Sequence, residues 1–224
     1  MPLDEINQLG QRLKGFYDRF RSSLRTQTHD TSEYGFWYVS GLLRLDTQRT
    51  MANIGRNTCV PEQNMQHFMS DSPWAGRELI AAIQDDVKQH AEFQTGAVLV
   101  VDESADEKAG DDSVGASRQH NGRLGKVEMS QVGVFGALVT PRVNMWIDGE
   151  LYLAKCWFED EYAERRKKVG WPDERTFKTK PELAWDIIQR VKAHHVPFVA
   201  VAMDDLYGRN VPLRRRLDQA GIEY

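Results

Sequence analysis

Hydrophobic residues recur at helical spacing through the first part of the chain, up to about residue 93. From Tyr34 to Asn53 the segment is rich in helix-forming residues. Its apolar positions lie on one face of a helix and are Phe36, Val39, Leu42 and Leu43. This pattern predicts one helix over the segment, with Gly55 as the residue that ends it.

Two further helices are predicted before residue 93. Glu62 to Met69 is a short helical stretch after Pro61, and Ser72-Pro73 is typical of an N-cap followed by a first-turn proline. The helix behind it has an apolar stripe formed by Leu79, Ile80, Ile83 and Val87. A helix, a glycine-containing turn and a short second helix fit a helix-turn-helix, whose second helix would enter a major groove of DNA. They also fit a plain helical bundle, which we favour because this spacing by itself is not specific to a helix-turn-helix. Residues 1–93 are therefore predicted to form an all-helical region.

Two later apolar runs each end in a pair of carboxylates. The run Ala97 to Val101 stops at Asp102-Glu103, and the run Phe198 to Met203 stops at Asp204-Asp205. Short β-branched runs of this kind are typical of strands buried on both faces. An ionised carboxylate at the end of a buried strand is costly unless a metal ion or a hydrogen bond compensates it. The pattern therefore indicates either a shared divalent-metal site or acids that simply cap buried strands.

The order of elements from residue 94 to 224 predicts an α/β domain. A strand-like stretch from Met129 to Val139 follows the first apolar run, and Asp148-Gly149 is a hairpin signal. A charged helix near residues 159–168 and a second helix from about Lys180 to His194 come next, before the last apolar run. This is the order of an RNase-H-like mixed sheet. That fold would place Asp102 and Asp204 on adjacent central strands at one edge of the sheet.

Composition excludes few classes of function. The formal net charge is −4, which argues against DNA binding driven by overall charge but permits a local basic track. Cys59 and Cys156 are the two cysteines and lack the spacing of a zinc site, so we expect free thiols. No stretch is long and apolar enough to span a membrane, and the N-terminus has no signal-peptide pattern, which predicts a cytoplasmic protein.

A series of short blocks, in this order, makes a family resemblance recognisable. They include Gln66-His67-Phe68, Ser72-Pro73-Trp74, Val100 to Ser104, Ser113 to Gln119, Gln131 to Phe135, Phe177 to Leu183 and Asp204 to Gly208. The series resembles the DDE-superfamily transposases of bacterial insertion sequences, in the group numbered seven-oh-one. The similarity runs from about residue 35 to the end of the chain.

The resemblance implies a metal-dependent transposase with an RNase-H-like catalytic domain. In that family, two Asp and one Glu hold two divalent ions, Mg²⁺ or Mn²⁺, for DNA cleavage and strand transfer. By resemblance Asp102 is the first acid and Asp204 the second, while Glu103 and Asp205 are not expected to be ligands. The implied partners are double-stranded DNA, at the element ends and the target, and further copies in a synaptic complex. The implied location is the bacterial cytoplasm, at the nucleoid.

Departures from the family pattern leave other functions open. The family's Glu lies on a helix well beyond the second Asp, whereas this chain ends twenty residues after Asp204, so we expect a sheet that is incomplete at its C-terminal end. The segment Ser104 to Asp112 is predicted to be an acidic loop where relatives carry lysines. One alternative is an inactive fragment that binds DNA or full-length transposase. A general metal-dependent phosphoesterase is a third interpretation.

Five residues are candidates for contacts with DNA. Three of them follow the first acid, in blocks that resemble the family or next to them: Arg118, Gln119 and Lys126. Lys178 and Lys180 flank a helix start, where the helix dipole does not favour cations, so a phosphate contact is an attractive role for them. For Arg118, Gln119 and Lys126, a solvated surface position or a pairing with the acidic loop is an equal explanation. The basic clusters 165–168 and 214–216 are the ones available for a DNA track, although charge runs on helices are more often only solvated faces.

Overall fold

The computed structural model describes residues 3–25, 30–110, 113–169, 171 and 174–224. The chain divides into two compact units, Met1–Ile83 and Gln84–Tyr224. The division lies inside helix α5 (Gly76–Val87), ten residues before the change of pattern on which the predicted boundary after residue 93 rests. The apolar stripe of α5 runs across the division without interruption, so hydrophobic periodicity carries no sign of it.

The described part of unit 1 is helical, as predicted. Besides the start of α5 it contains α1 (Leu3–Asp18), η1 (Arg21–Leu24), α2 (Ser32–Arg44), α3 (Met51–Thr58) and α4 (Glu62–Ser70). One hydrophobic cluster of its core is formed by Tyr17, Leu24 and Phe68, and Trp74 is among the partly buried side chains packed against them. The Trp74 indole nitrogen donates to the carbonyl oxygen of Phe68 at 3.1 Å, so Trp74 is attached to this cluster by packing and by a hydrogen bond.

The prediction of one helix from Tyr34 to Asn53 is wrong. The chain leaves the helix after Arg44 and starts α3 at Met51, where the side chain of Thr50 caps the new helix by accepting from Asn53 N at 3.2 Å. Gly55 lies inside α3, and a Cβ there would come within 2.6 Å of the carbonyl oxygen of Val60. The glycine is required for a close backbone approach and does not end the helix.

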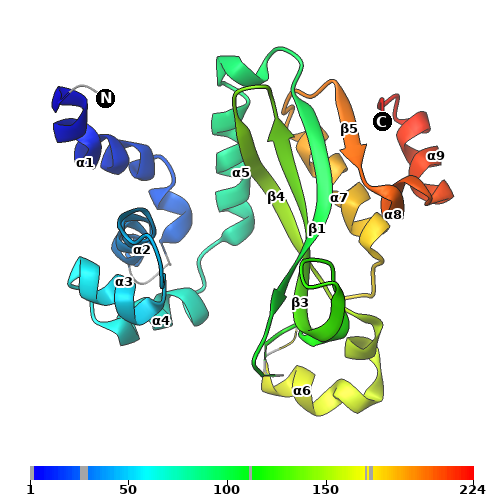
Figure 1. Ribbon diagram of the computed structural model, residues 1–224, viewed down its shortest axis with the longest axis horizontal. Coiled ribbons are helices and arrows are strands. Elements are labelled where there is room, and N and C mark those ends of the chain that lie inside the picture. Colours follow the sequence, from blue (N-terminus) through cyan, green and yellow to red (C-terminus); the bar gives the residue numbers. More distant parts are fainter. Residues whose placement is uncertain (1–2, 26–29, 111–112, 170, 172–173) are drawn as a thin grey trace. The chain divides into compact units, whose positions relative to one another are not determined.

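Unit 2 is a mixed sheet with helices, and Figure 1 shows their arrangement. The strands are β1 (Val98–Glu107), β2 (Ser117–Asn121), β3 (Lys126–Val139), β4 (Asn144–Tyr152) and β5 (Ala200–Met203). The helical elements are η2 (Ala91–Phe93), η3 (Lys155–Phe158), η4 (Asp160–Tyr162), α6 (Ala163–Lys168), α7 (Lys180–Ala193), α8 (Asp205–Gly208) and α9 (Val211–Gln219). The predicted α/β class, with a mixed sheet after a helical region, is confirmed.

The long strand β3 organises the sheet. It pairs antiparallel with β1 from Val98↔Val139 to Glu107↔Ser130, and antiparallel with both β2 and β4. On the other side of β1, β5 pairs in parallel, from Val98↔Ala200 to Val101↔Met203. Three antiparallel strands followed by a strand parallel to the first is the predicted RNase-H-like order, with the short strand β2 added between the first two.

Helix α7 packs on this sheet through an apolar face that is fully buried. Ile187, Ile188 and Val191 of the helix and Leu99 of β1 have no exposed surface. The helix begins at a capping box, in which the Thr179 side chain accepts from Glu182 N and the Glu182 carboxylate accepts from Thr179 N at 2.8 Å. The fixed start of α7 places Lys180 within hydrogen-bond distance of Glu103 in β1.

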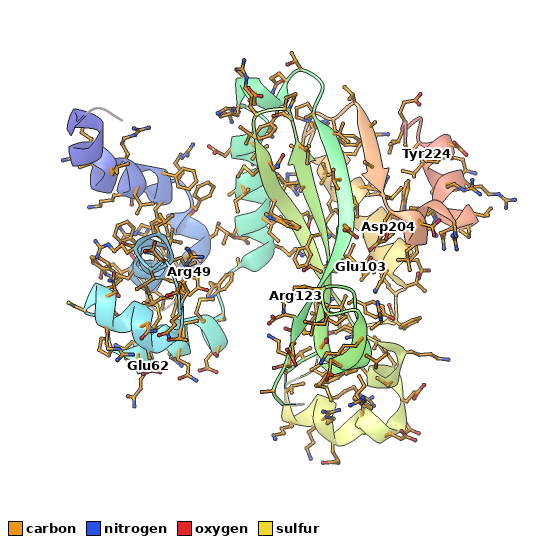
Figure 2. All side chains as sticks on the ribbon, in the orientation of Figure 1. Arg49, Glu62, Glu103, Arg123, Asp204 and Tyr224 are labelled. Carbon is orange, nitrogen blue, oxygen red and sulfur yellow. The ribbon has the colours of Figure 1, made fainter. Side chains whose placement is uncertain are left out.

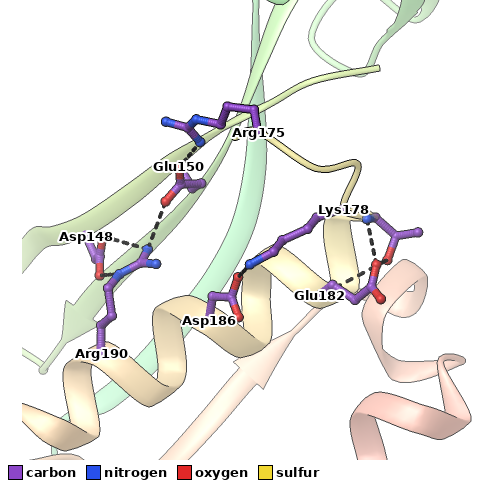
Figure 3. Close-up of polar contacts among 8 residues, drawn as sticks. Asp148, Glu150, Arg175, Lys178, Glu182, Asp186 and Arg190 are labelled. Carbon is purple, nitrogen blue, oxygen red and sulfur yellow. Dashed lines mark hydrogen bonds and ion pairs between the residues drawn. The ribbon is translucent and has the colours of Figure 1, made fainter. Parts of the chain in front are cut away.

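Two turn predictions in unit 2 are wrong. The segment Ser104 to Glu107 is no loop but continues β1 in register with β3, and residues 111–112 of the predicted loop lie outside the described residues. Asp148-Gly149 makes no hairpin, because β4 runs through both residues. The Asp148 side chain is buried and accepts from Arg190 Nε at 2.8 Å (Figure 3). Asp148, although typical of a turn, therefore attaches β4 to α7.

Candidate active site

Asp102 and Asp204 lie next to each other where the parallel pairing of β1 and β5 ends. The last residues paired between the two strands are Val101 and Met203; Asp102 is the next residue of β1, which continues to Glu107, and Asp204 is the residue that follows β5. The apolar residues before them, such as Leu99, Val101 and Val201, are buried, so the hydrophobic pattern fixes the register that brings the acids together. Figure 2 labels Asp204 beside Glu103, which follows Asp102 in β1.

Both aspartates line one cavity of about 350 Å³. Its charged and titratable lining residues are Asp102, Glu103, Asp204, Lys180, Arg123 and His120. The cavity therefore has carboxylates from β1 and from the residue after β5, with cationic side chains from the start of α7 and from the segment between β2 and β3. A second cavity, of about 220 Å³, contains neither aspartate and is lined by residues that include Glu150 and Arg175.

The environment of Asp102 raises the pKa of its carboxyl group. Burial is the main cause, and the negative charges of Glu103 and Asp204 raise it further. A hydrogen bond from Glu103 N to Asp102 Oδ1, at 2.8 Å, and the positive charge of Lys180 oppose the shift. A bound cation would relieve the repulsion that disfavours the ionised form of Asp102.

Asp204 has a structural role in addition to its position in the cavity. It is the N-cap of α8, and its Oδ1 accepts from Leu206 N at 2.9 Å and from Tyr207 N at 3.4 Å. Within the described ranges, Oδ2 of Asp204 and Oδ2 of Asp102 accept no hydrogen bond. The cap thus orients Asp204 and leaves one of its oxygen atoms for another partner.

Glu103 is bound on both of its oxygen atoms. Lys180 Nζ donates to Oε1 at 2.8 Å, and the Tyr207 hydroxyl donates to Oε2 at 2.7 Å. Burial opposes the ionisation of Glu103, but these two hydrogen bonds and the charge of Lys180 outweigh it and lower the pKa of the carboxyl group. Burial and the neighbouring carboxylate raise the pKa of Tyr207, which has no exposed surface. Glu103 therefore connects β1 to α7 and α8 as an ionised acceptor.

The donor set of the cavity fits a hard divalent cation incompletely. Carboxylate oxygen atoms are the ligands that Mg²⁺ and Mn²⁺ prefer, and Asp102 and Asp204 offer them from one edge of the sheet. Among the described residues, no three His, Cys, Asp or Glu side chains are grouped so as to hold a metal ion. Glu103 is close by, but its oxygen atoms are engaged by Lys180 and Tyr207.

The structure separates the five predicted DNA contacts. Lys180 alone among them lines the cavity. Arg118 is exposed on β2, Gln119 donates to the carbonyl oxygen of Ser130 at 2.8 Å, and Lys126 pairs with Glu128 at 2.8 Å. Lys178 pairs with Asp186 of α7 at 2.6 Å, on the side of the helix shown in Figure 3. Their role in DNA binding stays a prediction.

Three residues around the acids were not predicted from the sequence: Tyr207, His120 and Arg123. Tyr207 lies inside the block Asp204 to Gly208, where a phenol three residues after an acid carries no signal of its own. The turn signal Asn121-Gly122 places His120 and Arg123 at a hairpin tip. The turn signal does not show that this tip reaches Asp102 and Asp204.

With this geometry established, comparison with known proteins assigns the family. Residues 16–224 match the family described as DDE superfamily endonuclease, and the chain belongs to that family. Proteins of this superfamily use divalent metal ions.

A curated protein is similar to part of the chain. Over 154 residues the chain is 27% identical to a protein of Microchaete diplosiphon described as the probable transposase for insertion sequence element IS701. The match covers 66% of this chain but 36% of that protein, so the chain spans about a third of the length of its relative. No solved structure matches the chain significantly. Along the part of the chain that the structure describes, no helix combines the length and apolar character needed to cross a membrane.

Proposed function

We propose that this chain functions in the transposition of an insertion sequence, as a DDE transposase that binds element DNA and takes part in its cleavage and strand transfer. The observation that carries the proposal is the parallel register of β1 and β5, which places Asp102 and Asp204 on one cavity in a DDE endonuclease. The partners we propose are double-stranded DNA, at the element ends and the target, and further copies of the protein in a synaptic complex. The setting is the bacterial nucleoid.

In this proposal Asp102 and Asp204 hold Mg²⁺ or Mn²⁺ in a two-metal site. When bound, such ions sharpen an oxygen nucleophile and neutralise charge on the scissile phosphate. The chain's own residues have separate tasks. Asp204, fixed by its cap on α8, and Asp102, in β1, supply their oxygen atoms to the cavity, while Glu103 stays bound to Lys180 and Tyr207. The third acid that the family pattern expects stays a prediction of the resemblance.

Unit 1 is proposed to contact the element DNA. Helices α2, α3 and α4 pack against one another, and α4 follows α3 after a short connection that includes Val60 and Pro61. The exposed residues of α4 include Gln63, Asn64 and Gln66, whose amides can hydrogen-bond to base edges. This arrangement supports the helix-turn-helix interpretation as a proposal, with α4 as the helix that enters the groove.

Titration calorimetry with Mn²⁺ tests the metal site. Asp102→Asn and Asp204→Asn should each weaken binding by about tenfold or more, because each removes one charged oxygen ligand. Asparagine is also a good N-cap, so Asp204→Asn should keep α8 intact. The matched control is Asp205→Asn, next in sequence and paired with Arg209 at 2.6 Å, which should bind like the wild type. Equal binding by all four proteins would contradict the assignment.

The alternative function is a protein that binds DNA or full-length transposase without cutting. It is favoured by one observation, namely that the described residues supply the cavity with two carboxylates besides the engaged Glu103. Incubation of the purified chain with a labelled duplex and Mn²⁺ separates the two. Cleavage that Asp102→Asn abolishes supports the enzyme, whereas metal-independent binding without cleavage supports the alternative.

A further inference from the structure

The segment between β2 and β3 forms a hairpin whose tip is fixed in place. Leu124 N and Gly125 N donate to the carbonyl oxygen of Asn121 at 3.1 and 2.9 Å, and Gly125 has a left-handed φ of 65°. Gln119 Nε2 donates to the carbonyl oxygen of Ser130 at 2.8 Å, across the base of the hairpin. The conformation of the tip is therefore fixed by hydrogen bonds within the hairpin, which also fix the positions from which its side chains project.

This tip borders the cavity of the two aspartates. His120, Gly122 and Arg123 line it together with Asp102 and Asp204, and Figure 2 shows the label of Arg123 close to that of Glu103. The hairpin that follows the first acid in the chain therefore returns to the place where β1 and β5 stop pairing. It brings a guanidinium group to a site that also has three carboxylates and the ammonium group of Lys180.

The two cationic side chains of the cavity, Lys180 and Arg123, differ in how closely a carboxylate pairs with them. Lys180 donates to Glu103 at 2.8 Å and its side chain is 21% exposed, so its charge is already compensated. Arg123 is 64% exposed, and its ion pair among the described residues is to Asp106 at 4.0 Å. Asp106 in turn is bound by Lys108 at 2.8 Å. The guanidinium of Arg123 therefore has donors to offer to a molecule in the cavity.

We propose that Arg123 forms a phosphate-binding subsite at the hairpin tip. The subsite binds one phosphate of a DNA strand while the neighbouring phosphodiester of the same strand lies at Asp102 and Asp204. A planar guanidinium matches two phosphate oxygen atoms, which makes Arg the preferred residue for such contacts. Its position in the same cavity as the acids means that it orients the strand for reaction. This inference rests on the proposed function and adds the residue that positions the substrate there.

Anisotropy of a short fluorescein-labelled DNA duplex in Mg²⁺, over a series of salt concentrations, tests the subsite. Loss of one phosphate contact should lower the affinity of Arg123→Gln about fivefold near physiological salt, and reduce the slope of log K against log salt by about one. Arg123→Lys keeps the charge and should keep the slope while it loses part of the affinity. Arg142→Gln is the matched control, because Arg142 is an exposed arginine in the turn between β3 and β4, outside the cavity.

The outcomes distinguish the two proposals. If Asp102→Asn loses Mn²⁺ binding but Arg123→Gln binds DNA with wild-type affinity and slope, the subsite is refuted and the proposed function stands. If the wild type binds neither Mn²⁺ nor duplex, the proposed function fails and the subsite fails with it. An equal loss in Arg123→Gln and Arg142→Gln would show a general charge effect and would also refute the subsite.

Discussion

At the scale of single residues, Tyr207 supports the acids without lining their cavity. It is fully buried, and its hydroxyl donates to Glu103 Oε2 at 2.7 Å. Tyr207→Phe keeps the ring but leaves a buried carboxylate oxygen without its donor, so the pKa of Glu103 should rise. The expected cost is about 1–2 kcal/mol of unfolding free energy, measured by urea denaturation at neutral pH.

A second tyrosine provides the control for this prediction. Tyr224 also donates its hydroxyl to a carboxylate, Asp218 Oδ1 at 3.2 Å, but it is 49% exposed. Tyr224→Phe should change stability by less than about 0.5 kcal/mol, because water replaces the lost partner. If both variants were as stable as the wild type, the hydrogen bond from Tyr207 to Glu103 would not contribute to stability.

The fate of individual residues shows which roles can be predicted from sequence. Asp102 and Asp204 are recognisable in the sequence because each directly follows a short apolar run, which is a local pattern. Lys180 is recognisable as a cation near a helix start, but its partner Glu103 is 77 residues away. Pairings over such distances depend on strand register and helix position, which no local pattern contains.

At the scale of elements, strand β4 is where local preference is overruled. Asp148-Gly149 favours a turn, yet Gly149 lies beside the ring of Phe135, where a Cβ would come within 2.8 Å. The Asp148 side chain has no exposed surface and is bound by Arg190 of α7, with Nε to Oδ2 at 2.8 Å and Nη2 to Oδ1 at 3.1 Å (Figure 3). Tertiary packing on both faces of the strand thus replaces the turn.

This ion pair makes a prediction about the attachment of α7. Arg190→Met should lower stability by about 3–5 kcal/mol, because it leaves Asp148 buried and charged without its main partner. The double variant Arg190→Met with Asp148→Asn should regain part of that loss, since the uncompensated charge is gone. Urea denaturation of the single and double variants measures the coupling.

An exposed arginine is the matched control for this pair. Arg209 contacts Asp205 at 2.6 Å on the surface, and Arg209→Met should cost less than about 1 kcal/mol. A double variant no more stable than Arg190→Met alone would show that packing of the arginine stem, and not charge, holds the helix.

At the scale of the whole molecule, the sequence predicts the order of elements better than their ends. The RNase-H-like order follows from two buried runs, the long strand near residues 129–139 and the capped helix after Thr179, each with a clear local pattern. The division at Ile83–Gln84 and the position of the β2–β3 hairpin depend on how chain segments pack. The fold class and the proximity of Asp102 and Asp204 were therefore predictable, and so was Lys180 as a candidate, whereas His120 and Arg123 were not.

The melting temperature of the whole chain should depend on the ionisation of Asp102. Because the folded state raises the pKa of Asp102, its ionised form carries a cost at neutral pH, which disappears as the pH falls below the unfolded value near 4. In a chelator, Asp102→Asn should therefore melt about 1–2 °C above the wild type at pH 7, and the gain should vanish near pH 3.

A divalent metal ion should reverse the order of the two melting temperatures. The ion binds the folded wild type through the Asp102 carboxylate, whose negative charge destabilises the folded state when no metal is bound. At a tenfold excess over the wild-type dissociation constant, Mg²⁺ should stabilise the wild type by about 1.4 kcal/mol, or about 3–5 °C, and Asp102→Asn, with its tenfold or more weaker binding, by at most about 0.4 kcal/mol. Asp205→Asn, outside the cavity, should follow the wild type in both buffers. Differential scanning fluorimetry across pH, with chelator and with Mg²⁺, measures both effects. A wild type that melts above Asp102→Asn in chelator at pH 7 would mean that the acids are satisfied by the protein itself and need no cation.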